Sequence, residues 1–223
     1  MTRMPMTTKR LMTAHFALTM LLISGCGKIR HPDYYMLAVA PTVQKPALND
    51  AHQSATVAVR PFYTPEYLRQ GRIVYRQTPE EVGFYNYHRW ASDPGVVVTT
   101  GVIDALRSTN LFSVVAPYAG QEHPDYLLSG RLERLDELDY SKNVQVEVKI
   151  SAQLVNVRTG ASVWAGAVTQ TANVSDRDVN SVVVAMSHAV QAGIDELVAN
   201  MEKQLRDKAL AAANSGTAAA ANK

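Results

Sequence analysis

The chain has 223 residues, of which 47% are hydrophobic and 19% are charged, with 22 basic and 20 acidic side chains. Three of the basic residues precede position 26, so the rest of the chain carries 19 basic against 20 acidic side chains and lacks the concentrated positive charge of a nucleic-acid-binding protein. Its one cysteine excludes an intramolecular disulfide, and the length after position 26 is enough for one well-packed domain.

The first 25 residues have the pattern of a secretory signal peptide. Three basic residues and no acidic residue precede a short apolar run over residues 16–23. This run is much shorter than the about 20 apolar residues that a membrane-spanning helix needs. The small pair Ser24-Gly25 then directly precedes Cys26. This ending resembles the lipobox of bacterial lipoproteins, and the alternative is an ordinary signal peptide with a chance cysteine near its end.

The lipobox resemblance implies cleavage before Cys26, acylation of its thiol and of the new amino terminus, and a protein anchored to a membrane by this covalent lipid. Gly27 follows the cysteine in place of aspartate, which by resemblance to enterobacterial sorting favours the outer membrane, with the protein facing the periplasm. The inner membrane is the alternative location. Several acyl chains anchor a protein far more firmly than one chain does.

The residues after the anchor predict a lipidated stalk and leading segment over residues 26–54. Residues 28–33 are polar, and residues 34–37 form the first apolar cluster of the mature chain. Residues 41–54 contain proline, asparagine and aspartate without an apolar period, which is typical of a loop.

The first half of the domain alternates short strands with one helix. The predicted strands of this half cover residues 55–61, 72–76, 82–88 and 111–115. A turn or short helix is expected over residues 63–71. Asp93-Pro94 is a helix start signal, and the apolar stripe that follows it predicts a helix over residues 96–108.

The second half predicts a long hairpin. Residues 126–138 first alternate and then shift phase toward Leu135, which indicates a β-bulge or the end of the strand. Residues 144–154 alternate apolar and polar side chains throughout, so this strand has one buried and one solvated face. A tight turn over residues 158–160 joins it to a strand over residues 161–171.

A long amphipathic helix follows the hairpin. Ser175 and Asp178 resemble a capping box, and apolar residues then recur every three or four positions as far as Leu205. This apolar face predicts packing on the hairpin, because residues 178–200 contain none of the lysine and arginine residues that line the polar face of a membrane-binding helix. The alanine-rich residues 206–223 predict a disordered tail, and a frayed end of this helix is the alternative.

Together these elements predict an α+β domain over residues 55–205. Its sheet is expected to be mostly antiparallel with a long hairpin, and its two main helices are expected to pack on one face of the sheet.

The sequence contains no motif that predicts catalysis. It has no phosphate-binding glycine loop and no nucleophile elbow, and its six histidines are too far apart to suggest a metal site. Asp136, Glu137 and Asp139 form an acidic cluster that we interpret as a solvated strand end or turn, because acid–base catalysis needs a second converging group. We therefore expect no enzymatic activity, no metal and no cofactor beyond the covalent lipid on Cys26.

The most unusual stretch covers residues 75–90, where aromatic, histidine and arginine residues gather in a chain that is only 7% aromatic. Rigid aromatic side chains beside arginines are typical of binding surfaces. We predict that Arg76 and Arg89 contact polar groups or lipid headgroups, and that Tyr87 and Trp90 form a hydrophobic anchor. The alternative is an aromatic core, in which Trp90 packs under the first helix and Arg76 satisfies carbonyl groups.

Several motifs follow one another in a particular order between residues 34 and 205. They are Tyr34-Tyr35-Met36-Leu37, Val57-Ala58-Val59, Pro65 with Leu68, Ile73-Val74-Tyr75-Arg76, and Tyr87 with Arg89-Trp90-Ala91. In this order the chain resembles the ABC-type transport auxiliary lipoprotein family, whose members accompany MCE-type lipid transporters.

The family resemblance implies a non-catalytic accessory subunit that binds other proteins. Its partners would be an MCE-domain protein and the ABC transporter subunits, which move phospholipid or another hydrophobic substrate across the envelope. Direct contact with phospholipid and a homo-oligomer are further expectations, and no nucleic acid is expected.

A second resemblance leaves an alternative function open. Residues 125–130, followed by the long hairpin, resemble the amino-terminal domain of TolB and lipoproteins of curli secretion and penicillin-binding-protein activation. The alternative is therefore a TolB-like lipoprotein that regulates a peptidoglycan synthase or forms part of a secretion pore. Residues 144–154 have the length of a membrane strand of a pore, about 9–11 residues.

Overall fold

A 13-residue strand, β6 (Tyr126–Leu138), is central to an eight-stranded sheet in the structure, which is a computed structural model. The structure describes residues 30–40, 54–120, 123–140 and 143–220, and nearly all of them belong to one of the two units of the chain, Pro32–Lys223. The predicted signal peptide, Cys26 and residues 41–53 of the predicted loop lie outside the described residues.

The predicted long hairpin forms one side of the sheet. β6 pairs antiparallel with β7 (Gln145–Asn156), and β7 pairs antiparallel with β8 (Ser162–Asn173). The pairing of β6 with β7 shifts register between Leu132 and Arg134, so the predicted bulge is confirmed.

Short strands line the other edge of β6. β2 (Thr56–Val59) runs parallel to the beginning of β6, and β3 (Arg72–Arg76) runs parallel to its end. β5 (Val114–Pro117) lies parallel beside β2.

The outermost strands on the β3 side make a corner of the sheet. β4 (Gly83–Trp90) pairs antiparallel with β3, and β1 (Asp33–Tyr35) pairs parallel with β4. Among the described residues, four of the seven strand pairings are parallel, so the sheet is mixed. The expectation of a mostly antiparallel sheet is met only loosely, because the two longest pairings, β6 with β7 and β7 with β8, are antiparallel. The parallel pairs join strands that are distant in the sequence, which alternation along one strand does not predict.

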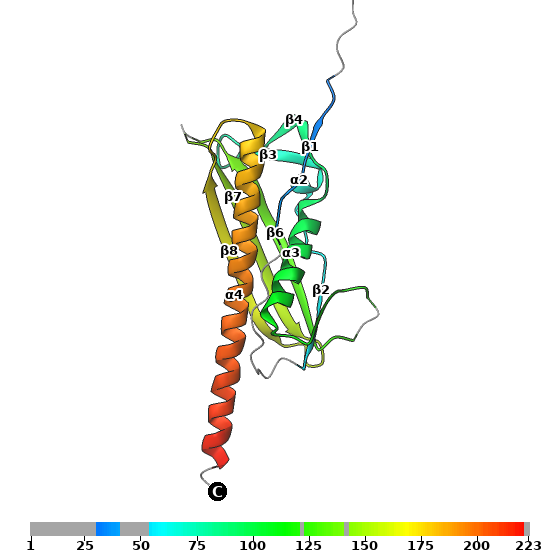
Figure 1. The fold of residues 1–223 in the computed structure, drawn as a ribbon, viewed down its shortest axis with the longest axis vertical. Coiled ribbons are helices and arrows are strands. Elements are labelled where there is room, and N and C mark those ends of the chain that lie inside the picture. Colours follow the sequence, from blue (N-terminus) through cyan, green and yellow to red (C-terminus); the bar gives the residue numbers. More distant parts are fainter. Residues whose placement is uncertain (1–29, 41–53, 121–122, 141–142, 221–223) are drawn as a thin grey trace, which may run out of the picture. The chain divides into compact units, whose positions relative to one another are not determined.

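Two long helices cover one face of the sheet and lie side by side on it (Figure 1). α3 (Pro94–Thr109) begins where the sequence predicts, because the Asp93 carboxylate accepts a hydrogen bond from the Gly95 backbone N–H at 2.7 Å. α2 (Glu66–Arg69) adds a single turn.

The second long helix, α4 (Val179–Ala220), differs from its prediction at both ends. Its cap is Asp178, whose carboxylate accepts hydrogen bonds from the Ser181 N–H at 3.1 Å and hydroxyl at 2.8 Å, so Ser175 is not the cap. The helix continues beyond Leu205 to Ala220, which agrees with the alternative of a helix end for these residues. Alanine is the best helix former, which explains this extension.

α4 packs its apolar face on β7 and β8, as predicted. The buried side chains of this contact include Met186, Val190, Ile194 and Leu197 of α4 and Val146, Val148, Ile150 and Leu154 of β7. Of the described helices, α4 alone is long and apolar enough to cross a membrane by length and composition, yet 61% of that stretch is buried inside the protein. Its hydropathy is therefore explained by its contact with the sheet.

The chain after β1 crosses the two long helices. The Ala38 N–H donates to the Ser187 hydroxyl at 3.1 Å, and the Ala40 N–H donates to the Gln191 side-chain oxygen at 2.8 Å. Leu37 is buried in the core. Residues 33–40, which we assigned to the leading segment, thus belong to the folded unit.

Phe62 connects α3 to the sheet. Its N–H donates to the Thr99 hydroxyl at 2.9 Å, and its ring occupies the space above Gly130 of β6. A Cβ atom at position 130 would lie 2.2 Å from the Phe62 ring, far closer than a van der Waals contact. Gly130 is therefore needed for this close approach.

We expect Gly130→Ala to lower the free energy of unfolding by about 1–3 kcal/mol, because the methyl group would displace the Phe62 ring. Urea denaturation checks this value. In a Phe62→Ala background the ring is absent, so the same substitution should cost clearly less. An equal cost in both backgrounds would contradict the role of the Phe62 contact.

Candidate functional site

The sequence-predicted residues Arg76, Tyr87, Arg89 and Trp90 all lie in the corner formed by β1, β3 and β4. Arg76 ends β3, where that strand pairs with the end of β6, and the other three end β4. The fold therefore brings these four residues into one region but places them in different environments, some in the core and some at the surface.

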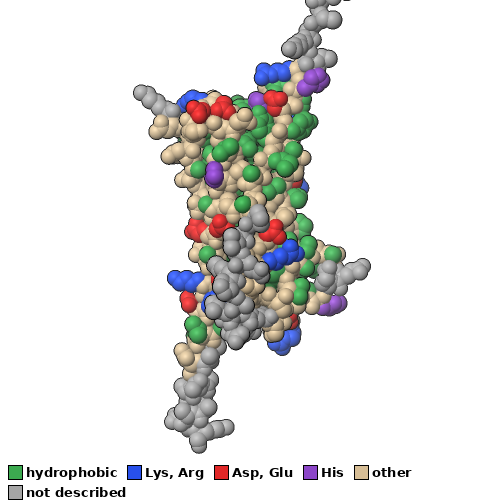
Figure 2. Space-filling model, viewed as in Figure 1, with side chains coloured by type: hydrophobic (Ala, Val, Ile, Leu, Met, Phe, Trp, Pro, Cys, Tyr) green, Lys and Arg blue, Asp and Glu red, His purple; other side chains and the backbone are tan. Residues whose placement is uncertain are grey.

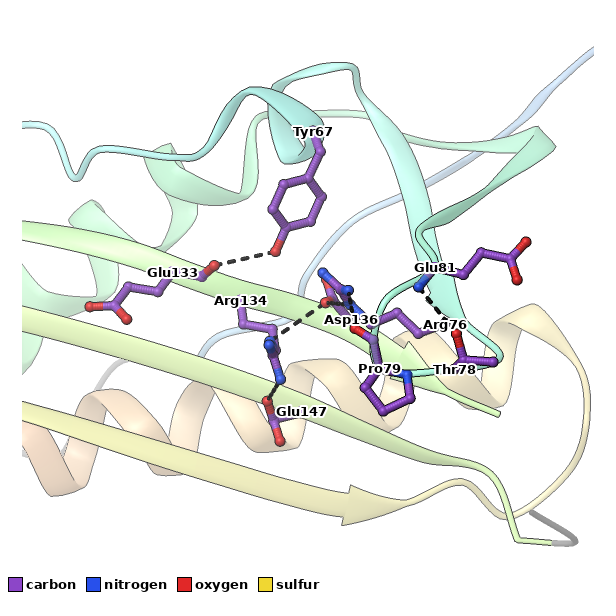
Figure 3. A network of polar contacts seen from close by, with 9 residues as sticks. All are labelled: Tyr67, Arg76, Thr78, Pro79, Glu81, Glu133, Arg134, Asp136 and Glu147. Carbon is purple, nitrogen blue, oxygen red and sulfur yellow. Dashed lines mark hydrogen bonds and ion pairs between the residues drawn. The ribbon is translucent and has the colours of Figure 1, made fainter. Parts of the chain in front are cut away.

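Arg76 is buried and forms an ion pair with Asp136 of β6 (Figure 3). Its Nε lies 2.5 Å from a carboxylate oxygen of Asp136, and its Nη1 donates to the Pro79 carbonyl at 3.1 Å. The side chain is thus held by two separate segments, the end of β6 and the loop after β3. This corrects the prediction of Arg76 as a headgroup contact and agrees with the alternative, in which it satisfies groups within the protein.

The ion pair continues into a network on the same face of the sheet. Asp136 has no exposed surface, and Arg134 Nε lies 3.7 Å from the carboxylate oxygen that Arg76 binds. Arg134 in turn forms an ion pair with Glu147 of β7 (Figure 3). The acidic cluster at the end of β6 is therefore not a solvated turn, because its first member is fully buried between two arginines.

Burial dominates the electrostatics of this network. It raises the pKa of Asp136, while the hydrogen bond and charge of Arg76 act in the opposite direction. Burial would lower the pKa of Arg76, but the hydrogen bond and charge of Asp136 outweigh it and raise that pKa. Tyr67 of α2 covers the pair, with its ring centre 5.8 Å from the Arg76 guanidinium, and burial raises the pKa of its phenol to about 12.

Glu137 is held by a second buried contact. The Tyr85 hydroxyl of β4 donates to its carboxylate at 2.8 Å, and the Tyr85 ring meets the Tyr75 ring edge-on, with the ring centres 5.2 Å apart. Burial raises the pKa of both Glu137 and Tyr85. Neither carboxylate of the pair Asp136 and Glu137 is therefore arranged as a solvent-facing acid or base.

Trp90 lies beneath the corner with only 6% of its surface exposed. Nearby, the Tyr35 hydroxyl lies 3.0 Å from His88 Nδ1, and the Asp33 carboxylate lies 3.7 Å from the same nitrogen. The burial of Trp90 thus agrees with the alternative of an aromatic core and not with an exposed hydrophobic anchor. Its ring packs in the core on the inner side of β1 and β4. Within the described part of the chain, its indole N–H has no hydrogen-bond partner.

The opposite face of the same strands is accessible. Tyr34 of β1 pairs in register with Arg89 of β4, and Arg89 pairs with Arg72 of β3. Tyr34 and Met36 are 64% and 66% exposed, and Tyr87 is 40% exposed. We call Tyr34, Met36, Arg72 and Arg89 the corner surface. In the view of Figure 2, hydrophobic side chains gather toward the upper part of the molecule, where Figure 1 places β1 and β4.

Tyr34, Met36 and Arg72 are the residues of the corner surface that our sequence reasoning did not select as site residues. Tyr34 and Met36 had appeared only as members of an apolar cluster. Tyr34 and Met36 could have been found from the sequence of residues 33–37, because residues two apart in a strand lie on the same face. One face of this strand would then present Tyr34 and Met36, and the other Tyr35 and Leu37.

Among the described residues, no three His, Cys, Asp or Glu side chains lie close enough together to hold a metal ion. A groove of about 350 Å³ lies between α4 and β8, lined among others by Trp164, Asn200, Lys203 and Asp207. This volume is at the lower end for a small-molecule pocket. The groove is formed near the turn of the hairpin, away from the corner.

Solved structures with the same fold include two proteins of undescribed activity. XCC0632 from Xanthomonas campestris, of the family DUF330, has a TM-score of 0.68 and 20% identity, covering 79% of this chain and 98% of its own. An uncharacterized protein has a TM-score of 0.56 and 15% identity, covering 78% of this chain and 99% of its own. These similarities establish the α+β fold with a mixed sheet and a carboxy-terminal helix.

A weaker similarity connects the chain to the PelC dodecamer from Paraburkholderia phytofirmans, with a TM-score of 0.42 and 20% identity, covering 74% of this chain and 94% of that one. No curated protein sequence matches the chain.

The sequence model of one family, described as the ABC-type transport auxiliary lipoprotein component, matches residues 35–215. The likeness to TolB stays a prediction.

Replacement of Arg76 by methionine would leave the Asp136 charge buried with a weaker partner. We expect Arg76→Met to lower the free energy of unfolding by about 3–5 kcal/mol, measured by urea denaturation. Arg69→Met is the matched control, because Arg69 is 49% exposed and pairs with Glu66 on the surface, where the change should stay within about 0.5 kcal/mol. Similar small losses in both variants would show that the buried pair does not stabilise the fold.

The buried Glu137 predicts a specific pH dependence. Its pKa in the folded protein lies above the usual 4.5, so its contribution is fully present below that value and is lost as the pH rises through the folded-state pKa. Glutamine at this position carries no charge at any pH. We therefore expect the stability of Glu137→Gln relative to the natural protein to increase from about pH 4 to about pH 8, measured by urea denaturation. A difference that stays constant with pH would refute this assignment.

Proposed function

The chain belongs to the family of ABC-type transport auxiliary lipoprotein components, and on this basis we propose that it is a lipid-anchored, non-catalytic subunit of an ABC transport system in the bacterial envelope. The observation that carries the proposal is the extent of the family match, residues 35–215, which begins within β1 and ends within α4. The family's description as a lipoprotein supports the lipobox at Cys26, which the sequence suggests independently.

We further propose that the transporter is of the MCE type and moves phospholipid or another hydrophobic substrate, and that the anchor lies in the outer membrane. In this role the protein contacts its partners through exposed residues of the corner. Tyr87 is its candidate contact with protein partners and Arg89 its candidate contact with lipid headgroups, because Arg76 and Trp90 are turned into the core. The rigid core beneath β4 supports such a contact, since a preorganised surface loses little freedom on binding.

The arrangement of the two buried carboxylates supports a role without catalysis. Asp136 is held by Arg76 and Glu137 by Tyr85, so both contribute to the packing of β6 against β3 and β4. Such buried contacts between strands are typical of structural networks, although among the described residues the second carboxylate oxygen of Asp136 has no hydrogen-bond partner.

The alternative of a secretion pore loses the feature that favoured it. The apolar side chains of β7, such as Val148 and Ile150, are buried beneath α4. A strand of a membrane pore would have to turn this face to lipid. In the described fold, the alternation of β7 is used for the core instead.

The proposal is tested by purification of the tagged full chain from solubilised envelopes of its own bacterium after crosslinking in the cell, with mass spectrometry of the co-purifying proteins. We expect an ABC ATPase, a permease and an MCE-domain protein. Recovery of ABC subunits without an MCE-domain protein would retain the family role and reject the MCE assignment. Recovery of a peptidoglycan synthase instead would favour the alternative.

We expect Tyr87→Ser to reduce the recovery of these partners at least several-fold, because an aromatic contact residue contributes strongly to an interface. Tyr63→Ser is the matched control, since Tyr63 is exposed to a similar degree, 48% against 40%, but lies on a different segment. Equal recovery with both variants, at normal protein level, would remove Tyr87 from the interface.

A further inference from the structure

We propose that the corner surface, formed by Tyr34, Met36, Arg72 and Arg89, docks on the headgroups of the bilayer that holds the lipid anchor. This inference rests on the proposed lipidation of Cys26 and adds an orientation to it. It assigns a membrane-contacting role to side chains of the folded domain, in addition to the acyl chains.

Strand pairing places the members of the corner surface on one side of the sheet. Tyr34 is the register partner of Arg89, and Arg89 is the register partner of Arg72, so their side chains form a row across β1, β4 and β3. Met36 follows Tyr34 by two residues and continues the same side. The other side holds Tyr35 and Trp90, which face the core.

The length of the connection to the anchor limits where this surface can lie. Seven residues separate Cys26 from Tyr34, and the eight residue steps between the two positions span at most about 29 Å when fully extended. The opposite end of the sheet, where Val157 follows β7, is separated from the end of β6 by a strand of 13 residues, about 40 Å long. An anchor at Cys26 therefore keeps Tyr34 within about 29 Å of the anchoring point, whereas the hairpin turn lies about 40 Å further along the sheet.

The chemistry of the corner surface fits a lipid headgroup region. Tyrosine side chains are enriched at the boundary between water and hydrocarbon, and arginines are attracted by the negative surface of anionic lipids. Lys28 and Arg30 add two basic residues to the short connection. The acidic residue of the same strand, Asp33, is a register partner of His88 and lies 3.7 Å from it, on the side away from the row.

A lipid chain combined with basic residues binds a membrane more stably than either signal alone. Here the proposed acyl chains on Cys26 are followed in the sequence by the basic residues Lys28 and Arg30. The short connection leads from them to the corner surface, which holds Arg72 and Arg89. The combination would fix the orientation of the domain on the bilayer and direct the hairpin turn away from it. A bilayer is favoured over a protein partner at this surface, because the short connection brings the bilayer to it without any other component.

Site-directed labelling of the full lipidated chain tests the inference. Acylation consumes the thiol of Cys26, so the cysteine introduced by Met36→Cys is the one free thiol available for a nitroxide label. The labelled protein is reconstituted into vesicles of phosphatidylcholine with and without phosphatidylglycerol. Accessibility of the label to oxygen and to a water-soluble nickel complex reports its depth. Val157→Cys, at a site that is 47% exposed, is the matched control.

We expect the label at position 36 to be shielded from the nickel complex in vesicles containing phosphatidylglycerol, and the label at position 157 to stay accessible. Arg89→Glu should lower the ratio of docked to undocked protein at least about fivefold, since each basic residue near an anionic surface contributes about that factor. Arg89→Lys keeps the charge and should keep the docking, which separates loss of attraction from a folding defect.

The outcomes separate this inference from the proposed function. Equal accessibility of both labels, in protein whose Cys26 is acylated by mass spectrometry, would overturn the docking and leave the lipoprotein role intact. Shielding that requires an added protein partner would likewise overturn it. If Cys26 is not acylated, the proposed anchor fails and the inference fails with it.

Discussion

The corner of the sheet depends on one buried charge. Asp136 has no exposed surface, so its carboxylate is stable in the core only with a cation beside it, and Arg76 of β3 provides that cation. This pair ties the end of β3 to the end of β6, two strands that are sixty residues apart in the chain. β4 pairs with β3 and β1 pairs with β4, so the position of every outer strand of the corner follows from this contact.

The corner divides one aromatic and basic stretch of sequence between two environments. Successive residues of a strand point to opposite faces, so Trp90 and Tyr35 enter the core while Arg89 and Tyr34 reach the surface. The buried half gives rigidity, and the exposed half gives a surface whose geometry is fixed. Buried and exposed side chains are thus both present in one short strand, and the alternative of an aromatic core applies to Trp90.

The long helix shows why hydropathy alone does not decide between membrane and core. α4 has the length and composition of a membrane span, yet most of its apolar stretch is buried against β7 and β8. Asp178 fixes its start, and the contact with the hairpin uses its apolar face. The hydropathy of α4 is therefore explained by its contact with the sheet, and the anchor proposed at Cys26 is a separate candidate for membrane contact.

Local patterns in the sequence determined the hairpin, the bulge in β6, the start of α3 and the packing face of α4, because each depends on residues that are neighbours in the chain. The lipobox at Cys26 and the family order of motifs are also readable in this way, although Cys26 lies outside the described residues. Only the tertiary structure decided that the sheet is mixed and that Asp136 is buried. Both depend on β3, which reaches β6 from a distant part of the sequence, and no local pattern records which strand becomes the neighbour or which arginine meets the carboxylate.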